Sequence, residues 1–384
     1  MELKTIIGHT QAQPRPYQER IVNKTSDMFM GRHRGSDGKI QKPSRSVLIQ
    51  SPTGSGKTIM ALLAARLLQE QNPELVVGWV AMRRNLLAQA RKENVEKEIG
   101  VQNIHYTSMF DKYPEALLNA KEEGKQVLLV IDEAQHDAAA SCAHLHNIVE
   151  PEMTLGMTAT PFRTDRMKLC FDSVIQDAGI HRLIQDGYLS QYNHYTIQDW
   201  RPETVCKHYL SDPERWGKSI FYFQDLSLCS KAHEILEGAG ITVDTVTGDS
   251  DWESQLKAFR NGDVRCLINC MKLTEGFDEP ALHTAWVRDS GKGCTMQMGG
   301  RAFRIHPKLP VKNIVQSKNT RWPFIRTAMP HMQYLWQNDA WASLKVNPQI
   351  EEINQNARVA IAQIEVTLPQ FLLNKQKKKR APVF

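Results

Sequence analysis

Short apolar runs alternate with segments of helical pattern along most of this chain, in two successive blocks. Such alternation predicts parallel sheets with helices on both faces, and two blocks predict a two-lobed α/β protein. The predicted strands are Val47–Gln50, Leu75–Ala81, Val127–Ile131 and Leu155–Met157, then Ser219–Phe223, Ile241–Thr247, Arg265–Asn269 and His283–Arg288. The predicted helices are Lys57–Gln71, Asn85–Glu98 and Lys112–Glu123, then Leu226–Glu237, Trp252–Arg260 and Thr295–Arg304.

A length of 384 residues accommodates two such lobes and a short extension. Gly, Ser, Asn and Pro accumulate between Gly187 and Pro202, which is typical of a linker. We therefore expect a first lobe over residues 1–188, a second over 189–315, and a mainly helical C-terminal extension with a basic tail over 316–384. The extension holds an amphipathic helix candidate whose apolar stripe is Ile350, Ile353, Ala357, Ile361 and Ile364.

The composition and charge of the chain limit the classes of protein to which it can belong. With 41% hydrophobic and 23% charged residues, the chain is typical of a globular protein. No apolar stretch is long enough for a transmembrane helix and the N-terminus lacks the pattern of a signal peptide, so we expect a cytoplasmic protein that makes no membrane contact. The net charge is +6, but five of these charges lie in the last ten residues. Nucleic-acid binding would therefore depend on local basic clusters.

A glycine-rich segment, SPTGSGKT at residues 51 to 58, directly follows the first predicted strand and precedes a helix. In this context the backbone N–H groups of the turn and of the helix N-terminus bind phosphate together. Lys57 would neutralise the β- and γ-phosphates, and the Thr58 hydroxyl would ligate Mg²⁺. The remaining residues assigned to the phosphate loop are Thr53, Gly54, Ser55 and Gly56.

Two acidic residues follow the strand VLLVI. Asp132 stands where a metal-side carboxylate belongs in an open parallel sheet, and we assign it to Mg²⁺. The adjacent Glu133 should point the other way on an extended backbone, where it could orient and deprotonate an attacking water. The alternative is that two acids merely end a strand.

These segments occur in the order found in superfamily two helicases, and the sequence resembles the DEAD/DEAH-related branch that includes type III restriction subunits and excision-repair-type helicases. The resemblance covers roughly residues 14 to 305. R-P-Y-Q at 15–18 resembles the Q-motif, SPTGSGKT and DEAQ resemble motifs one and two, and T-A-T at 158–160 resembles motif three. LTEGFDEP at 273–280 and QMGGRAFR at 297–304 resemble motifs five and six.

The resemblance implies two RecA-like P-loop lobes in tandem, with ATP and Mg²⁺ between them. It implies that Gln18 reads the adenine edge, and that Gly276 and Asp278 lie in the same cleft, where Asp278 binds ribose or braces an arginine. Gln297, Arg301 and Arg304 stand at i, i+4 and i+7, so on a helix all three share one face. We expect both arginines to reach the γ-phosphate, and Gln297 to couple the lobes.

Nucleic-acid contacts are assigned to five residues: Arg83, Arg84, Thr158, Thr160 and Thr274. The two arginines follow a predicted strand where motif Ia lies in the family, and they suit phosphate contact. Three tryptophans interleaved with arginine, Trp322, Trp336 and Trp341, could stack on bases, but we favour a role in the core of the extension.

The sequence thus predicts an ATP-dependent nucleic-acid helicase or translocase. DNA is favoured over RNA because the closer relatives of this motif set act on DNA. The alternatives are a branch remodeller, an RNA helicase, or an ATP-clamp subunit of a defence or restriction complex. The C-terminal extension is the expected surface for any protein partners.

Overall fold

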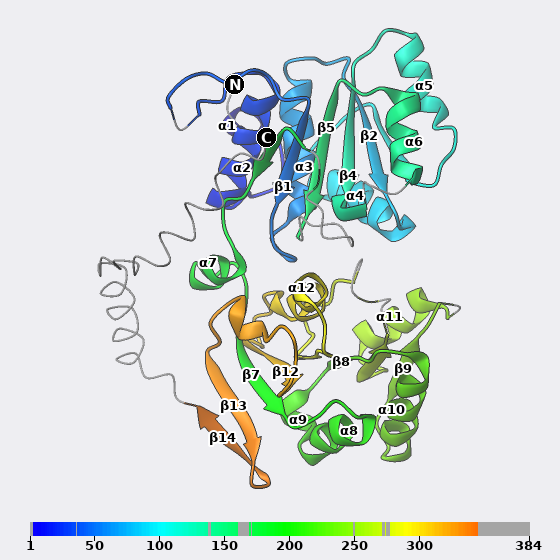
Figure 1. Cartoon of the computed structure of the whole chain (residues 1–384). Helices are drawn as coiled ribbons and strands as arrows, with labels where there is room; N and C mark the ends of the chain where they lie inside the picture. Colours follow the sequence, from blue (N-terminus) through cyan, green and yellow to red (C-terminus); the bar gives the residue numbers. More distant parts are fainter. Residues whose placement is uncertain are drawn as a thin grey trace, which may run out of the picture.

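The computed structural model describes residues 3–35, 37–136, 140–159, 169, 171–248, 250–270, 273 and 277–344. Two α/β lobes follow one another along the chain, each built on its own sheet (Figure 1). The helix candidate at 350–364 and the basic tail lie outside the described residues. In the described part of the chain, no helix combines the length and the apolar character that crossing a bilayer requires.

The first lobe contains a six-stranded, entirely parallel sheet. Two of its central strands are buried along their whole length, as expected for a parallel sheet covered on both faces. The strand order is β3(Ile104–Ser108), β2(Val76–Ala81), β4(Val127–Asp132), β5(Met153–Thr158), β1(Ser46–Gln50) and β6(Ser173–Ile175). The carboxyl ends of β2, β4 and β5 point toward the second lobe (Figure 1).

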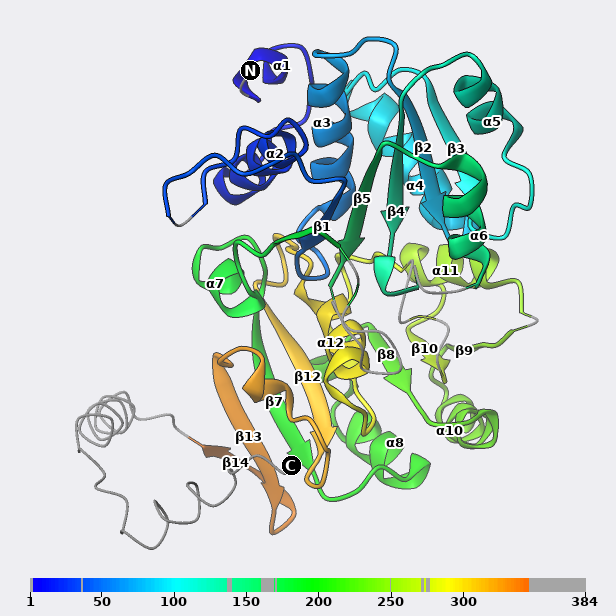
Figure 2. The same ribbon diagram turned by 45° about the horizontal axis from the view of Figure 1, so that its top comes forward.

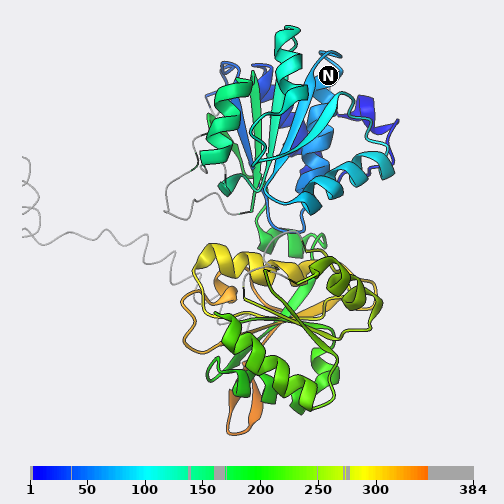
Figure 3. The ribbon, with the colours of Figure 1, turned by 90° about the vertical axis from the view of Figure 1, so that its right-hand side faces the viewer.

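Helices cover both faces of this sheet. One face carries α1(Lys4–Ile7), α2(Pro16–Phe29), α3(Lys57–Gln69) and α4(Arg84–Glu96). The other carries α5(Glu115–Glu122) and α6(Ala140–Val149). A short helix, α7(Ile180–Gln185), lies between the lobes (Figure 3). The core on the α2–α3 face continues through Leu183, Leu189 and Tyr192 into the second lobe.

The second lobe contains an eight-stranded sheet, which is parallel except for one antiparallel pair at its edge. The strand order is β14(Ala340–Leu344), β13(Met332–Gln337), β7(Gln191–Ile197), β12(Val311–Ser317), β11(Thr284–Trp286), β8(Ser219–Tyr222), β10(Cys266–Asn269) and β9(Val243–Val246). Its helices are α8(Pro202–Ser211), α9(Pro213–Trp216), α10(Leu226–Gly238), α11(Trp252–Asn261) and α12(Lys292–Gly300). Figure 2 shows how β13 and β14 extend this sheet beyond β7.

In the described part of the predicted extension, the short 3-10 helix η4(Phe324–Arg326) is followed by strands. Residues 332–344 form the hairpin β13–β14 and add two strands to the second sheet, which therefore continues past residue 315. Aromatic packing explains this placement: Trp336 packs on His208 of α8 at a ring-centroid distance of 4.6 Å, and Trp341 lies 5.0 Å from Tyr195 of β7. Trp336 and Trp341 therefore serve in packing, as favoured from the sequence, but from strands rather than helices.

Candidate nucleotide site between the lobes

The phosphate loop connects β1 to α3 as the sequence predicts. Gly54 and Gly56 both have positive φ, at 86° and 79°, a conformation that side-chain-bearing residues rarely adopt. Gly56 is the N-cap of α3, and no side chain in the described part of the molecule caps this helix end. The first N–H groups of α3 are therefore open to an anion.

The Q-motif segment braces this loop from α2. The hydroxyl of Tyr17 donates to the Ser55 carbonyl at 2.6 Å, and the Gln18 Nε2 donates to the same oxygen at 2.7 Å. The Gln18 Oε1 accepts from the Arg15 N–H at 2.8 Å. Both ends of the Gln18 amide are thus bonded within the chain, so Gln18 fixes the loop in this structure. Its reading of adenine stays a prediction.

The two acids lie at the carboxyl end of β4, but their backbone is not extended throughout. Glu133 has φ of 55°, in the left-handed region, and its N–H donates to Asp132 Oδ1 at 3.0 Å. The prediction of an extended Glu133 is therefore wrong, because the chain turns at this residue into the short helix η1(Ala134–His136). Burial, with repulsion from Glu133, raises the pKa of Asp132 to about 7. Burial also lowers the pKa of Lys57.

Gln135, the last residue of DEAQ, connects motif two to motif three. Its Nε2 donates to Glu133 Oε2 at 3.0 Å, and its Oε1 accepts from the Thr158 hydroxyl at 2.6 Å. Thr158 is fully buried at the end of β5, so it is not placed to touch a nucleic-acid strand. The prediction for Thr158 is corrected accordingly, because its hydroxyl is directed inward to Gln135. Thr160, Thr274 and Gly276 lie outside the described residues.

The second lobe supplies two arginines to the site. The Arg301 Nη1 donates to the Phe277 carbonyl at 2.7 Å, and Arg304 Nε forms a 2.6 Å ion pair with Asp278 Oδ1. A Cβ built on Gly54 would lie 3.3 Å from Arg304 Nη1, so this guanidinium rests directly on the phosphate loop. Two roles were predicted for Asp278, binding ribose and bracing an arginine, and the ion pair with Arg304 corresponds to the second.

The three motif-six residues do not share one α-helical face. Helix α12 ends at Gly300, residues Arg301–Phe303 form the 3-10 helix η3, and Arg304 is extended. The consecutive glycines 299 and 300 explain the early end, because glycine is a poor helix former. Gln297 is half-buried on α12 and does not line the cavity that holds both arginines.

The linker is bonded to the arginine-bearing segment. The Ser190 N–H donates to the Phe303 carbonyl at 2.9 Å, and its hydroxyl donates to the Arg304 carbonyl at 2.9 Å. Gly300 also approaches the phosphate loop: a Cβ there would lie 3.2 Å from Thr53 Cβ. The backbone that carries Arg301 and Arg304 is therefore fixed to the joint between the lobes.

These residues enclose a cavity of about 300 Å³ between the lobes. The first lobe lines it with the phosphate loop, Gln18, Asp132 and Glu133, and the second with Phe277, Asp278, Arg301 and Arg304. Nearly all of the predicted nucleotide residues that the structure describes thus meet in one place. Ser55 is the exception: it lies directly behind the lining, with its side chain fully buried.

Helix α4 contributes residues to this cavity that sequence reasoning missed. Leu86, Gln89 and Glu93 line it, and the Gln89 Nε2 donates to Glu93 Oε1 at 2.9 Å. The Glu93 Oε2 is buried and has no hydrogen-bond partner among the described residues, and burial raises the pKa of this carboxyl. The i, i+4 spacing of Gln89 and Glu93 was a signal that they share a face, but nothing in the sequence showed what that face meets.

The predicted phosphate-contacting arginines lie at the carboxyl edge of the first sheet. Arg83 is the half-buried N-cap of α4, and Arg84 is exposed on the first turn. Neither lines the nucleotide cavity. Arg84 is exposed on the outer surface of this edge.

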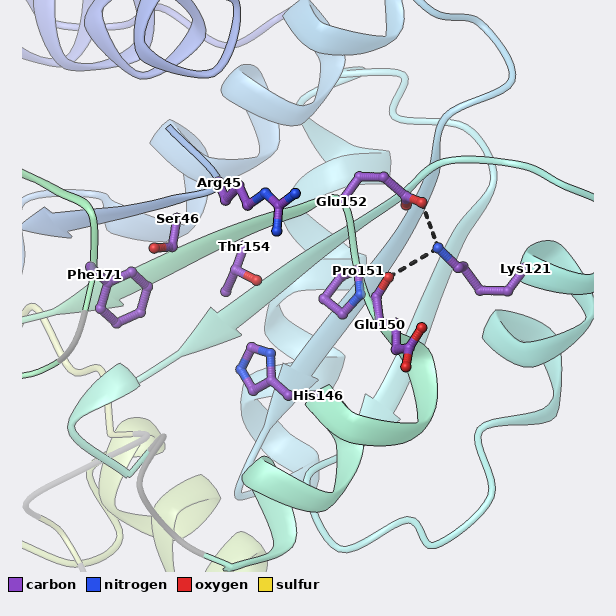
Figure 4. A pocket seen from close by; sticks show the side chains of 9 residues that line it. All are labelled: Arg45, Ser46, Lys121, His146, Glu150, Pro151, Glu152, Thr154 and Phe171. Carbon is purple, nitrogen blue, oxygen red and sulfur yellow. Dashed lines mark hydrogen bonds and ion pairs between the residues drawn. The ribbon is translucent and has the colours of Figure 1, made fainter. Parts of the chain in front are cut away.

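A larger, more open cavity of about 780 Å³ lies at the opposite, amino edge of the first sheet (Figure 4). Lys121 there pairs with Glu152 at 2.5 Å and donates to the Glu150 carbonyl at 2.9 Å. This cavity contains none of the predicted site residues, so its size does not make it the functional centre.

Known proteins show which family this site resembles. Residues 11–109 match the family model described as type III restriction enzyme, res subunit. The Schizosaccharomyces pombe protein irc3, named as a mitochondrial ATP-dependent helicase, is 24% identical over 358 residues, covering 79% of this chain and 57% of its own. A 51.5 kDa protein of a Lactococcus phage is 24% identical over 267 residues, covering 61% of this chain and 56% of its own.

The resemblance to superfamily two helicases of the restriction-subunit type is therefore confirmed. The chain spans just over half the length of these two relatives.

Solved structures show the same two-lobed α/β fold. The ATP-dependent Type ISP restriction-modification enzyme LlaBIII, bound to DNA, superposes with a TM-score of 0.53 and 15% identity, covering 81% of this chain and 28% of LlaBIII. A variant of Saccharomyces cerevisiae Dbp5 bound to RNA and ADP BeF3 also gives a TM-score of 0.53, with 14% identity, covering 89% of this chain and 97% of Dbp5. The two parallel-sheet lobes thus share the fold of these two proteins.

Proposed function

We propose that this chain is an ATP-driven helicase or translocase that couples hydrolysis between its lobes to movement along a nucleic-acid strand. One observation carries the proposal: Lys57 and Glu133 from the first lobe line the same cavity as Arg301 and Arg304 from the second. A site shared between lobes changes with every opening and closing of the cleft. Hydrolysis there is consequently coupled to relative movement of the lobes.

Each side chain has a defined task in phosphoryl transfer. Lys57, at the N-terminus of α3, would contact the β- and γ-phosphates. Glu133 would orient the attacking water and accept its proton, while Gln135 holds the Glu133 carboxylate in position. Arg301 and Arg304 would stabilise the negative charge that develops on the γ-phosphate.

Thr58 and Asp132 would hold Mg²⁺. Both line the cavity beside Lys57, and hydroxyl and carboxylate oxygens are the ligands that this cation prefers. The buried Asp132 carboxylate fits this role, because a dication stabilises its ionised form against burial. When bound, Mg²⁺ neutralises phosphate charge during transfer.

DNA is the nucleic acid along which we propose that the chain moves. The match to a restriction res subunit and the DNA-bound LlaBIII structure support DNA, whereas the RNA-bound Dbp5 structure keeps RNA as the alternative. Exposed Arg84 and the neighbouring Arg83 would bind the strand through its phosphates, which carry no sequence information.

The test is a titration of ATPase activity with single-stranded DNA, duplex DNA, forked DNA and RNA, run beside strand displacement on the same molecules. We expect the strongest stimulation by DNA. Lys57→Ala should abolish turnover, Glu133→Gln should lower it roughly 100-fold or more, and Arg304→Ala should lose turnover while keeping nucleotide affinity.

Glu96→Gln is the matched control for Glu133→Gln, because Glu96 is an exposed glutamate outside the cavity. Its turnover should equal that of the wild type. Unchanged stimulated turnover in Glu133→Gln would contradict the assigned base. ATP-dependent retention of DNA without any turnover would instead identify a clamp.

A further inference from the structure

Two large aromatic side chains project from the loop between β3 and α5. Phe110 is 60% exposed and Tyr113 is 67% exposed, which is unusual for residues of this size. The nucleotide site uses neither of them. Rings exposed in this way offer flat apolar surface to a binding partner.

The loop that carries them is fixed rather than loose. Met109 and Pro114 are buried on either side, and the Met109 N–H donates to the Ala81 carbonyl of β2 at 3.0 Å. The Tyr113 N–H donates to Asp111 Oδ1 at 3.1 Å. The backbone therefore presents both rings outward from a defined turn.

The same edge carries the basic residues proposed to contact phosphates. Ala81 of β2 pairs with Ser108 of β3 in parallel register, so Arg83 and Phe110 each stand two residues beyond paired positions on neighbouring strands. Arg84 and Lys112 are exposed beside them. The exposed acids Asp111 and Glu115 lie in the same segment, and Asp111 is engaged by its own turn.

We propose that Phe110 and Tyr113 form a base-stacking platform for a single strand of nucleic acid. The proposal rests on the proposed function. Arginines and a lysine at this edge provide charge complementarity to a phosphate backbone, and exposed rings beside them suit the faces of unpaired bases. The strand would keep its phosphates toward Arg83 and Arg84 while its bases stack on the rings.

The test measures binding of a fluorescent oligothymidine to the full-length chain by anisotropy. Phe110→Ala and Tyr113→Ala should each weaken binding about 5- to 150-fold, the loss expected for one stacked base. Tyr113→Phe should bind as the wild type does, because it keeps the ring. Thermal unfolding of each variant checks that the fold is intact.

A second probe separates stacking from phosphate contact. An abasic oligomer of the same length keeps its phosphates but offers no bases, so the alanine variants and the wild type should bind it equally. The slope of log affinity against log salt should stay the same in Phe110→Ala and become shallower in Arg84→Ala. Val174→Ala is the matched control, because Val174 is 49% exposed on β6 at the other edge of the sheet.

Three results would overturn the platform: unchanged affinity in both alanine variants, an equal loss on the abasic oligomer, or a change in self-association without a change in strand binding. Failure of the proposed function is distinguishable from these results, because it would show as a wild-type chain whose ATPase no nucleic acid stimulates.

Discussion

Gly56 is the residue at which the phosphate loop, helix α3 and the Q-motif segment meet. Its φ of 79° lies in the left-handed region, and a Cβ there would lie 2.5 Å from Gln18 Nε2. A side chain at this position would therefore strain the backbone and displace the amide that braces Ser55. The conformation of the phosphate loop therefore depends on Gly56 having no Cβ.

Gly56→Ala should accordingly weaken ATP binding by about 5- to 150-fold, because strain of roughly 1 to 3 kcal/mol would distort the loop. Fluorescent ATP-analogue binding measures the effect. Gly238→Ala is the control: Gly238 ends α10, its Cβ would meet nothing within 4 Å, and the change should leave stability unaltered or raise it by up to about 1 kcal/mol. Equal affinities in the two variants would refute this account of the loop.

Single residues also show what a sequence can predict. Lys57, Asp132 and Arg304 were predictable because each belongs to a short motif at a strand or helix end, where local geometry decides position. Glu93 was not, because its place in the cavity depends on how α4 packs against its surroundings. The burial of Thr158 depends likewise on Gln135, whose side chain reaches it across two neighbouring strand ends.

At the scale of elements, the hairpin β13–β14 is attached to the second lobe by aromatic packing. The Trp341 ring lies 5.0 Å from Tyr195, 5.5 Å from His208 and 5.7 Å from Trp216, which come from β7, α8 and α9. Contacts of this kind contribute beyond the apolar area that they bury. The hairpin is therefore part of the folding unit rather than an appendage.

Trp341→Ala should lower the free energy of unfolding by about 2 to 4 kcal/mol, because it removes a large ring from this cluster. Chemical denaturation monitored by fluorescence measures the loss. Leu344→Ala on the same strand should change stability by less than about 0.5 kcal/mol, since Leu344 is 43% exposed. If both variants were equally stable, the hairpin would not be held by its tryptophan.

The elements that the sequence failed to predict have a shared physical cause. The fully buried strands β2, β4, β8 and β10 were found because they are continuous apolar runs. Strands β7 and β12 are also mostly buried but were missed, because polar residues such as Asn193 and Lys312 interrupt them. By contrast, β13 is only half-buried and β14 mostly exposed, so neither shows the pattern of a core strand. Helix α12 was predicted too long because residue periodicity continues through the point where two glycines end the helix.

At the scale of the whole molecule, the nucleotide cavity and a continuous core both join the lobes. Leu189 packs near Gly54, and the core on the α2–α3 face extends through Tyr192 into the second lobe. The two lobes are therefore joined at two places, the hydrophobic core and the cavity, and a nucleotide would occupy the cavity.

A non-hydrolysable ATP analogue should consequently protect both lobes. At 100 times its dissociation constant, it should stabilise the folded chain by about 2.7 kcal/mol. Hydrogen exchange should slow in the phosphate loop and also in the segment from Arg301 to Arg304. Lys57→Ala should show neither change, and protection confined to the first lobe would contradict a shared site.

Ser190 fastens the joint between the lobes to the backbone of Phe303 and Arg304. The guanidinium that rests on the phosphate loop is thus carried by backbone that is hydrogen-bonded to the linker between the lobes. In the proposed opening of the lobes, this positive charge would move away from the hydrolysed nucleotide as the cavity widens. Release of ADP and phosphate would then need no separate conformational step, because the opening of the cavity and the withdrawal of Arg304 would be one movement.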